Sequence, residues 1–575
     1  MMKLYRFLKP FKISVVAVLL LVFIQTLSEL YLPTLMSDIV DIGIVQGDTN
    51  YIIRIGGFML LIAAGGTICS IFASYLSAKT SIGFGQLLRS KVFSRVEDFS
   101  LHEFNQMGTA TLITRTTNDI NQVQTVTFMI LRMMVSAPMM CIGGIIMALS
   151  KDKALSLVLL VSIPVIAAVI GIIMRQAMPL FRLMQIKLDR LNLVLRESLT
   201  GIRVIRAFNR IDQERQRFTE ANTDLTNNAI HVNKLIAILM PSMMLVMNFT
   251  IIAIIWFGSV RIDSGGMQVG SLMAFIQYAI QIMVALIMLS MMFIMLPRAS
   301  ASAVRIDEVL ETIPEIKDAS QIKRPVSDKG YLEFREVSFR FPGAEQPALN
   351  HISFTANPGE ITAFIGGTGS GKTTLINLIP RFYDVDQGAV LIDGVDVREM
   401  SQSKLRAKIG LVPQTAVLFT GTITENIRYG KPEASIDEVY KAAETAQAME
   451  FISGMKNGFE SVIEQGGINV SGGQKQRLSI ARALVRRPYI YIFDDSFSAL
   501  DFKTDARLRA ALKKETLEST VLIIAQRVTT VIDADRIIVL EDGQIVGIGR
   551  HKELLNSCGV YREIVYSQLS EEELA

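Results

Sequence analysis

The sequence Gly-Gly-Thr-Gly-Ser-Gly-Lys-Thr, Gly366 to Thr373, decides the fold of the second half of the chain. It has the form G-x-x-x-x-G-K-[ST]. It follows an apolar, strand-like run from Ile361 to Ile365 and precedes a helix-like run from Thr373 to Ile379. Glycines let backbone N–H groups surround phosphates, and the N-terminus of a helix adds a partial positive charge. We therefore expect this stretch to bind a nucleoside triphosphate.

Individual residues of this loop have separate expected roles. Lys372 can reach the β and γ phosphates, and the hydroxyl of Thr373 can hold Mg²⁺. The other predicted nucleotide-binding positions of the loop are Gly366, Gly367, Thr368, Gly369, Ser370, Gly371 and Thr374.

The first half of the chain has the composition of a membrane domain. Half of the 575 residues are hydrophobic and 19% are charged, while the net charge of +4 is too small to indicate nucleic-acid binding. Apolar runs near the roughly 20 residues that span a bilayer occur at 13–36, 52–78, 130–150, 154–174, 235–257 and 268–297. So many runs favour six transmembrane helices over buried helices of a soluble protein, and the first is expected to be a membrane helix rather than a signal peptide.

The placement of Lys and Arg predicts the orientation of these helices. The connection from Ser37 to Asn50 has no Lys or Arg, whereas the segments Lys79 to Val126 and Arg175 to Lys234 are rich in them. Cytoplasmic loops carry the excess of basic residues. We therefore expect these two long segments, the N-terminus and the second half of the chain to be cytoplasmic, although Lys151 and Lys153 give a weak opposing signal.

Both long basic segments keep a helical pattern of apolar residues, so the membrane helices are expected to continue for several turns beyond the bilayer. Each segment must then fold back. Short helices able to touch the soluble domain are predicted at the bends, near Phe104 to Thr111 and near Asn209 to Phe218.

Apolar runs of this length stop near residue 300, and short strand-like and helical segments alternate after it. The predicted fold is therefore multidomain: an all-α six-helix transmembrane domain at 1–312, a linker at 313–330, and an α/β P-loop NTPase domain at 331–575. The cysteines Cys69, Cys141 and Cys558 lack metal-binding spacing and are expected to be unpaired thiols.

Residues downstream of the loop complete a nucleotide site. The apolar run from Tyr489 to Phe493 ends at Asp494, which is placed to hold Mg²⁺, and Asp495 stands where a carboxylate would activate water. Ser471, Gly472, Gly473 and Gln474 precede a helix and form a second expected anion site. One nucleotide seldom needs two such sites, so we expect each to face a different molecule.

Two further residues join the candidate site. Gln414 follows a strand-like run in a polar turn. Phe341 could stack on a purine, although for this residue alone a place in the core is the simpler interpretation.

With these motifs in place, nearly the whole chain resembles a half-size exporter of the ATP-binding-cassette (ABC) family, which works as a dimer. The resemblance implies ATP and Mg²⁺ as cofactors. It implies that Phe341 stacks on adenine, that Gln414 senses Mg²⁺, and that Ser471 to Gln474 is the signature sequence. It further implies that Ser498 to Asp501 crosses to the partner and that Glu464 contacts a cytoplasmic bend of the partner, although Gln465 replaces an arginine that the family usually has nearby.

Two departures from the family pattern affect catalysis. The family usually has Glu after the Mg²⁺-binding Asp, where this chain has Asp495, and a switch histidine where this chain has Gln526. Asp is one methylene shorter than Glu. Gln can hydrogen-bond a γ-phosphate but cannot carry a positive charge or shuttle a proton. Since loss of a general base typically costs 10²–10⁴-fold, we expect the site built on this chain to hydrolyse ATP poorly.

The resemblance implies that two ATP molecules lie between one chain's phosphate loop and the other chain's signature. A homodimer would then have two impaired sites, whereas a heterodimer would have one. The expected partner is a second half-size exporter with the intact Glu and His, in a bacterial inner membrane. Open alternatives are a homodimeric exporter, a lipid or lipopeptide flippase, and a membrane-anchored ATP sensor without transport.

The expected substrates are small hydrophobic or amphipathic molecules, as in multidrug exporters. The fifth and sixth spans are rich in methionine, at Met240, Met243, Met244, Met247, Met283, Met288, Met291, Met292 and Met295. Flexible thioethers suit a cavity that adapts to varied ligands, although packing against lipid or other helices explains them equally well. Asn248, Gln277 and Gln281 are polar residues at membrane depth and are expected to face a cavity.

Overall fold

The structure is a computed structural model that describes residues 1, 3–319, 321–323, 325 and 328–569. The chain divides into two compact units. The helical unit comprises Met1–Glu97 and Gly108–Thr312, and the α/β unit comprises Asp98–Met107 and Ile313–Ala575. Part of the predicted linker (320, 324 and 326–327), the last residues of the predicted second domain (570–575), and the side chain of Met291 lie outside what is described.

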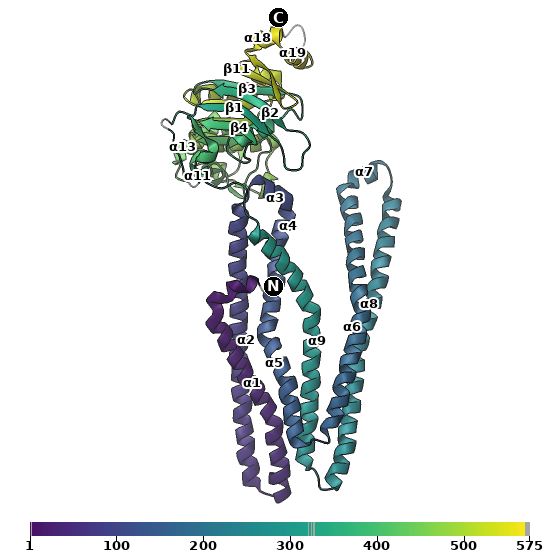
Figure 1. Cartoon of the computed structure of the whole chain (residues 1–575). Coiled ribbons are helices and arrows are strands. Elements are labelled where there is room, and N and C mark those ends of the chain that lie inside the picture. The colour runs from purple at the N-terminus through teal and green to yellow at the C-terminus, as the bar shows by residue number, and fades with distance from the viewer. Residues whose placement is uncertain (2, 320, 324, 326–327, 570–575) are drawn as a thin grey trace. The chain divides into compact units, whose positions relative to one another are not determined.

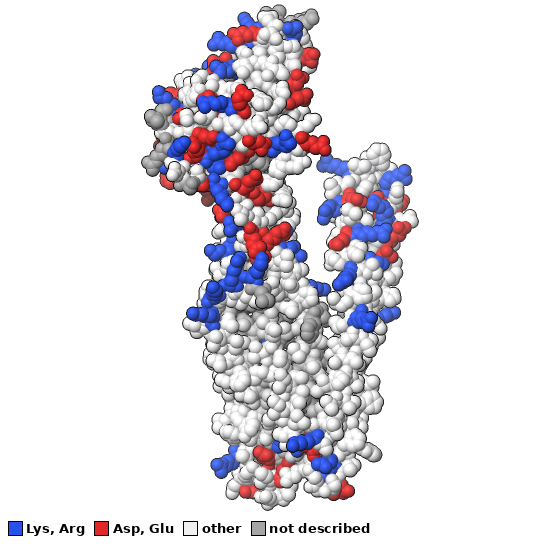
Figure 2. Space-filling model, in the orientation of Figure 1, with Lys and Arg blue, Asp and Glu red and all other residues white. Residues whose placement is uncertain are grey.

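The helical unit consists of long helices (Figure 1). Among the residues that the structure describes, six helical segments of this unit are long and apolar enough to cross a membrane. Their elements are η1 (Leu4–Phe11), α1 (Lys12–Asp38), η2 (Ile39–Ile44), α2 (Thr49–Glu97), α4 (Thr109–Thr114), η3 (Arg115–Asp119), α5 (Ile120–Lys151), α6 (Ser156–Thr200), α8 (Ile211–Asp263) and α9 (Val269–Glu311). The middle of this unit carries almost no charged residues on the face drawn in Figure 2, as a segment in contact with lipid requires.

The helices extend well beyond the apolar stretches that identify them. The second predicted span ends at residue 78, but α2 continues to Glu97; the fourth ends at residue 174, but α6 continues to Thr200. Both helices therefore continue for several turns beyond the predicted spans.

The second predicted bend is displaced in the structure. The short helix at this bend is α7 (Ile202–Ala207), whereas most of the predicted segment, Asn209 to Phe218, forms the start of α8. Gly201 separates α6 from α7, and Asn209 takes a left-handed backbone conformation with φ 51°. Asn tolerates this region better than most residues do, so the chain turns at Asn209, the first residue of the predicted segment, and the short helix precedes that segment.

An ion-pair clasp joins the third and sixth helical segments. Asp119, at the end of the π-helical turn η3, accepts hydrogen bonds from Arg305 Nε at 2.7 Å and from the hydroxyl of Ser302 at 2.8 Å. One turn away, Arg115 pairs with Glu308 at 2.8 Å. Asp119 is buried, so these contacts satisfy a carboxylate that has little access to solvent.

The α/β unit contains two larger sheets and one small one (Figure 1). The strands are β1 (Leu332–Phe339), β2 (Leu349–Ala356), β3 (Ile361–Gly366), β4 (Gln387–Ile392), β5 (Val395–Asp396), β6 (Ile409–Val412), β7 (Gly421–Thr422), β8 (Val462–Ile463), β9 (Ile490–Asp494), β10 (Thr520–Ile524), β11 (Arg536–Glu541) and β12 (Gln544–Gly549). The central sheet has the order β12-β11-β3-β10-β9-β6 and is parallel except for β12; an antiparallel sheet has the order β2-β1-β4-β5.

Alternate residues of the central strands enter different hydrophobic clusters. Phe493 and Ile523 belong to one cluster with α15 (Gly472–Arg486), whereas Ile492 and Leu522 belong to another with the antiparallel sheet. A parallel sheet buried on both faces requires such apolar strands. The remaining helices are α3 (Leu101–Met107), α10 (Lys372–Leu378), α11 (Gln402–Ala407), α12 (Ile423–Arg428), α13 (Ile436–Thr445), α14 (Met449–Gly454), α16 (Phe502–Glu515), α17 (Val528–Val531), α18 (His551–Ser557) and α19 (Gly559–Tyr566), with short 3₁₀ turns η4 (Val397–Glu399), η5 (Gly458–Glu460) and η6 (Gln465–Gly467).

Candidate nucleotide site

Four neighbouring parallel strands bring the predicted catalytic residues to one edge of the central sheet. The phosphate loop follows β3, Gln526 follows β10, Asp494 and Asp495 lie at the end of β9, and Gln414 follows β6. Ligands of open α/β sheets bind at the carboxyl ends of the strands. The topology therefore gathers residues that are as far apart in the sequence as Gly366 and Gln526.

The phosphate loop depends on its glycines. Gly371 has φ 95°, and a Cβ atom there would lie 2.8 Å from the backbone oxygen of Ala348. At Gly366 a Cβ atom would lie 2.1 Å from the backbone oxygen of Leu540. Any other residue at either position would clash with backbone that cannot easily move, so the loop can close tightly only with glycine.

The ammonium group of Lys372 lies inside this loop. It donates to the backbone oxygens of Gly366 at 2.9 Å and Gly367 at 2.7 Å, and to the hydroxyl of Ser370 at 3.2 Å. Burial lowers the pKa of Lys372, and the carboxylates Asp494 and Asp495 oppose this effect. The loop thus holds a buried cation, which suits the binding of phosphate.

Asp494 and Thr373 supply oxygen atoms suited to Mg²⁺. The Thr373 hydroxyl donates a hydrogen bond to the Asp494 carboxyl. Burial, and next the charge of Asp495, raise the pKa of Asp494 to about 6. Mg²⁺ usually binds one or two protein oxygens together with phosphates and water, so this pair fits a metal that arrives with a nucleotide.

Asp495 lies beside Gln414. Burial raises the pKa of Asp495, and hydrogen bonds from Gln414 and Ser498 partly oppose it. Its backbone N–H donates to Ile524 at 2.9 Å. The backbone at Asp495 is therefore held to the neighbouring strand, while the side chain faces the predicted Mg²⁺-sensing residue.

The side chain of Gln526 is exposed. The backbone around it is held by hydrogen bonds to a residue that lies outside the nucleotide site. The side chain of Gln568 donates to the backbone oxygen of Gln526 at 2.8 Å and accepts from the N–H of Val528 at 2.8 Å. Sequence reasoning did not identify Gln568, because nothing in the residues near it points to a loop 42 positions earlier.

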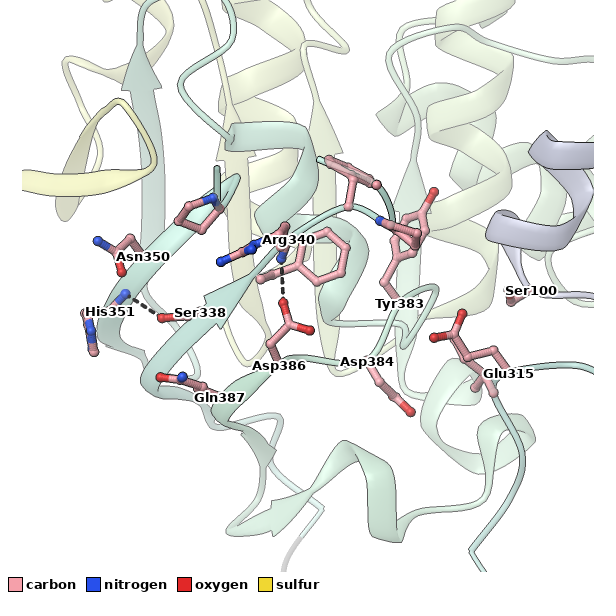
Figure 3. Close-up of a pocket in the computed structure, with 16 residues that line it drawn as sticks. Ser100, Glu315, Ser338, Arg340, Asn350, His351, Tyr383, Asp384, Asp386 and Gln387 are labelled. Atoms are coloured by element: carbon pink, nitrogen blue, oxygen red, sulfur yellow. Dashed lines mark hydrogen bonds between the residues drawn. The ribbon is translucent and has the colours of Figure 1, made fainter. Parts of the chain in front are cut away.

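Phe341 borders a pocket of about 490 Å³ (Figure 3). Its ring packs edge-on against Phe339 and Tyr383, with ring centroids 5.0 and 5.5 Å away, and the residue remains 38% exposed. An exposure this large excludes the interpretation of Phe341 as a core aromatic. The ring is available to a planar ligand, as a residue that stacks on a base must be.

The wall of this pocket continues toward the phosphate loop. Asn350 and Pro347 line the pocket, and Ala348 between them approaches Gly371 of the loop. Arg340 donates its backbone N–H to Asp386 at 2.6 Å, which fixes the turn that carries Phe341 (Figure 3). The ring of Phe341 and the phosphate-binding loop therefore lie close to each other within the α/β unit.

The predicted signature starts α15. The Ser471 hydroxyl accepts from the N–H of Gln474 at 3.3 Å, and Gln474 accepts from the N–H of Ser471 at 2.9 Å. Ser471 and Gly472 are exposed, while a Cβ atom at Gly473 would lie 3.0 Å from the backbone oxygen of Ala499. Among the described residues, no hydrogen bond joins this segment to the chain's own phosphate loop. The signature is formed and faces outward, which leaves it free to contact another molecule.

The residues around Glu464 also form an exposed loop. Glu464 donates its N–H to the side chain of Asn469 at 3.0 Å, and Gln465 starts the short turn η6. Lys475 closes the loop by donating to the backbone oxygen of Gly466 at 2.9 Å.

Helix α3, which overlaps the first predicted bend from Phe104 to Met107, packs in the α/β unit. The buried carboxylate of Glu103 accepts from the N–H of Glu315 at 3.1 Å and from the N–H of Ser100 at 2.7 Å. Asn105 hydrogen-bonds to the hydroxyl of Tyr383, which also packs against Phe341. The bend therefore lies one side chain away from the proposed base-stacking ring, a relation that depends on tertiary structure and has no local sequence signal.

Comparison with known proteins identifies both parts of the chain. Residues 15–286 match the ABC transporter transmembrane region, and residues 349–498 match the ABC transporter family. An uncharacterized ABC transporter ATP-binding protein of Mycobacterium tuberculosis is 44% identical, covering 98% of this chain and 97% of that protein.

Further relatives differ in the substrate that they are named for. A fatty acid ABC transporter ATP-binding/permease protein of Mycobacterium tuberculosis is 35% identical over 83% of this chain and 75% of its own. An ATP-dependent lipid A-core flippase of Chromobacterium violaceum is 32% identical over 95% and 94%. The solved structure of a bacterial Atm1-family ABC exporter with ATP bound matches with a TM-score of 0.82 and 25% identity, covering 97% of this chain and 99% of that one.

Proposed function

The chain belongs to the ABC transporters, as a half-size exporter with fused transmembrane and ATP-binding domains, and from this premise we propose that it is the hydrolysis-impaired half of a heterodimeric multidrug exporter. ATP binding and hydrolysis drive the transport. In the proposed assembly this chain pairs with a second half-size subunit in the bacterial inner membrane, with the N-terminus and the α/β unit in the cytoplasm. Mg²⁺ would be held by Thr373, Asp494 and Gln414 and would balance charge on the bound phosphates.

One observation carries the proposal: the two catalytic positions are altered while the signature is intact. The Asp495 side chain is one methylene shorter than Glu, so its carboxylate is drawn back from a water at the γ-phosphate. Gln526 cannot take up a proton or a positive charge. By contrast, Ser471 to Gln474 are complete and capped, and Ser471 and Gly472 are exposed. Such a chain would supply an intact signature to the nucleotide site built on its partner. The site built on its own phosphate loop would lack an effective general base.

The proposal is tested by comparing ATP turnover of the purified chain alone and with its partner. The candidate partner is a half-size exporter encoded in a neighbouring reading frame, with Glu and His at the two altered positions. We expect low turnover from this chain alone and an increase of about tenfold or more on co-expression, since a competent general base is worth about 10²–10⁴-fold. Brisk turnover from this chain alone would contradict the heterodimer and favour a homodimeric exporter.

Lipid transport is the second candidate function, and a specific feature favours it. A groove of about 650 Å³ lies between α6 and α8, and its lining is almost entirely apolar, including Val161, Phe249 and Phe257. Acyl chains would fit such a lining, and two relatives are named for a fatty acid and for lipid A. Vesicles that contain the complex should export amphipathic dyes under the multidrug proposal, whereas movement of labelled lipid alone would support the flippase.

A nucleotide sensor without transport makes a distinct prediction. It would bind ATP but would move neither dye nor lipid against a gradient. Measurement of ATP-dependent solute accumulation in sealed vesicles separates this case from both transport functions.

A further inference from the structure

A carboxylate lies inside the first membrane-spanning helix. At a rise of about 1.5 Å per residue, Glu29 lies about 25 Å along α1 from Lys12 and about 13 Å from Asp38. The hydrocarbon core of a bilayer is about 30 Å thick. Apart from the neighbouring Ser28, the residues close to Glu29 on both sides, Leu27 and Leu30 to Leu32, are largely apolar. Ionisable residues at such depth are rare, and they usually face a cavity and have a function.

Glu29 has a neutral partner rather than a cation. The side-chain amide of Gln25, one turn earlier on α1, donates to Glu29 Oε1 at 2.9 Å. Across the described part of the chain, no Lys or Arg forms an ion pair with Glu29. The arginine of the third span, Arg132, instead donates to the hydroxyls of Ser70 and Ser74 on α2. A charge on Glu29 is therefore not compensated within the described protein.

A second acceptor, on the sixth span, lies next to the backbone of Glu29. Gln281 of α9 donates its amide N–H to the backbone oxygen of Glu29 at 3.2 Å, which fixes the orientation of the amide. The other end of the amide, Gln281 Oε1, is buried and has no hydrogen-bond partner. Gln277, one turn before Gln281, is exposed. Buried polar atoms are normally paired, so this oxygen leaves the negative end of an amide dipole uncompensated at the contact between α1 and α9.

The contact between the two helices is well supported. The Tyr278 hydroxyl donates to the backbone oxygen of Leu30 at 3.0 Å and shares a hydrogen bond with Thr34 at 2.7 Å. Leu30 and Tyr278 are buried in one hydrophobic cluster. Glu29 and Gln281 are therefore held at the edge of a packed interface, half-buried, and not on mobile segments.

We propose that Glu29 and Gln281 form a recognition site for lipophilic cations. Both groups offer oxygen acceptors, and a carboxylate within the membrane is complemented best by a positive charge with an apolar body. This inference rests on the proposed export function and narrows its substrate class from hydrophobic molecules in general to cationic amphiphiles.

The test measures binding and transport of tetraphenylphosphonium, a permanent lipophilic cation, and of triphenylphosphine oxide, a neutral molecule with similar rings. Both are measured in vesicles that contain the full-length chain and the subunit that co-purifies with it. We expect Glu29→Gln to weaken binding of the cation about tenfold, the effect of removing about 1.4 kcal/mol, with less than a twofold change for the neutral probe. Glu29→Asp should retain part of the preference for the cation.

The chain supplies a matched control. On α8, Glu220 accepts a hydrogen bond from Gln216, one turn earlier, at 3.1 Å, the same arrangement as Glu29 and Gln25 but on an exposed surface. Glu220→Gln removes the same charge from the same pair and should leave both probes unaffected.

Three outcomes would overturn the inference. Unchanged binding of the cation by Glu29→Gln would show that the carboxylate does not recognise charge. Equal losses for both probes would show a structural role. Transport of the neutral probe but not of the cation by the wild-type complex would refute the cation site and leave the proposed export function intact. A separate outcome, transport of neither probe, would refute the proposed export function itself.

Discussion

Asp495 lies directly beside Asp494 at the end of β9, and its charge is the second cause, after burial, that raises the pKa of Asp494 to about 6. The two adjacent carboxylates therefore differ in function. Asp494 must lose its proton to hold a metal, and its neighbour opposes that loss. The proximity makes the site sensitive to pH near neutrality.

The first prediction is that nucleotide binding in the presence of Mg²⁺ weakens as pH falls below about 6, because the Asp494 carboxyl becomes protonated. Asp495→Asn removes the neighbouring charge, so the pKa of Asp494 should fall and the binding profile should shift to lower pH. Titration of a fluorescent ATP analogue between pH 5 and 8 measures this shift. An unchanged profile in Asp495→Asn would show that the two carboxylates are not coupled.

The same raised pKa predicts the sign of a stability effect in the nucleotide-free protein. The folded state favours protonated Asp494, so this contribution is fully present below the ordinary pKa of 3.8 and is lost as pH rises through about 6. Thermal unfolding of nucleotide-free wild type and Asp495→Asn should show a smaller decrease of Tm with rising pH in the variant.

The second prediction ranks two substitutions in the proposed heterodimer. Under this proposal the site built on this chain already lacks a competent base, so Asp495→Asn should lower total ATP turnover less than about twofold, whereas Ser471→Arg should remove most turnover by disrupting the partner's site. Steady-state ATPase at saturating ATP decides the ranking. Ser435→Arg is the matched control, since Ser435 caps α13 with a capping box like that of Ser471. Equal, severe losses at Asp495 and Ser471 would refute the asymmetric assembly.

The third prediction concerns Lys372. Lys372→Ala removes the cation that donates to three groups of the phosphate loop, so ATP affinity should fall about 10- to 100-fold, as loss of a charge-assisted hydrogen bond worth about 1.5–3 kcal/mol implies. Equilibrium binding of labelled ATP measures it. Lys404→Ala, at an exposed position on α11, should bind ATP like wild type.

The fourth prediction separates ATP binding from transport at the two bends. Tyr383→Phe removes the hydrogen bond to Asn105, and Phe208→Asp places a charge on a side chain that is 73% exposed next to α7. Both variants should bind ATP normally and transport less, because a bend transmits movement without contacting nucleotide. Ile186→Asp, at an exposed site on α6, controls for the added charge. Full transport by both bend variants would contradict these roles.

The fifth prediction tests the support of Gln526. Gln568→Ala deletes two hydrogen bonds that hold the loop after β10, each worth about 0.5–1.5 kcal/mol. We expect Tm of the α/β unit in the full-length protein to fall by about 2–4 °C. Gln544→Ala, at an exposed position on β12, should have no such effect.

The sequence predicted those features that depend on local pattern. The glycines of the phosphate loop, the strand before it and the carboxylates after β9 are adjacent in sequence to what they act on, and the six apolar segments are visible because a bilayer demands about 20 apolar residues. Phe341 could not be decided from sequence, since an aromatic in a turn can be buried or exposed. The structure leaves it exposed.

The remaining features depend on long-range packing. Gln568 reaches Gln526 only because the C-terminal helices return to the central sheet, and Asn105 meets Tyr383 only because α3 packs in the α/β unit. The second bend was misplaced because the apolar pattern of α8 extends back to Ile211, while the reversal depends on Gly201 and Asn209. Glu29 was overlooked since a single acidic residue barely lowers the hydropathy of its span.

The clasp between Asp119 and Arg305 has a mechanical consequence. Three covalent connections join the two units, between Glu97 and Asp98, between Met107 and Gly108, and between Thr312 and Ile313. Two of these routes lead to the clasp: one runs from α3 through Gly108 into α4, η3 and α5, and the other from Ile313 back into α9. Because the clasp joins η3 to α9, these two routes are also connected to each other within the helical unit. A rotation imposed on either route would therefore be transmitted to the third and sixth spans together. Removal of the contact between Asp119 and Arg305 would let each span rotate independently.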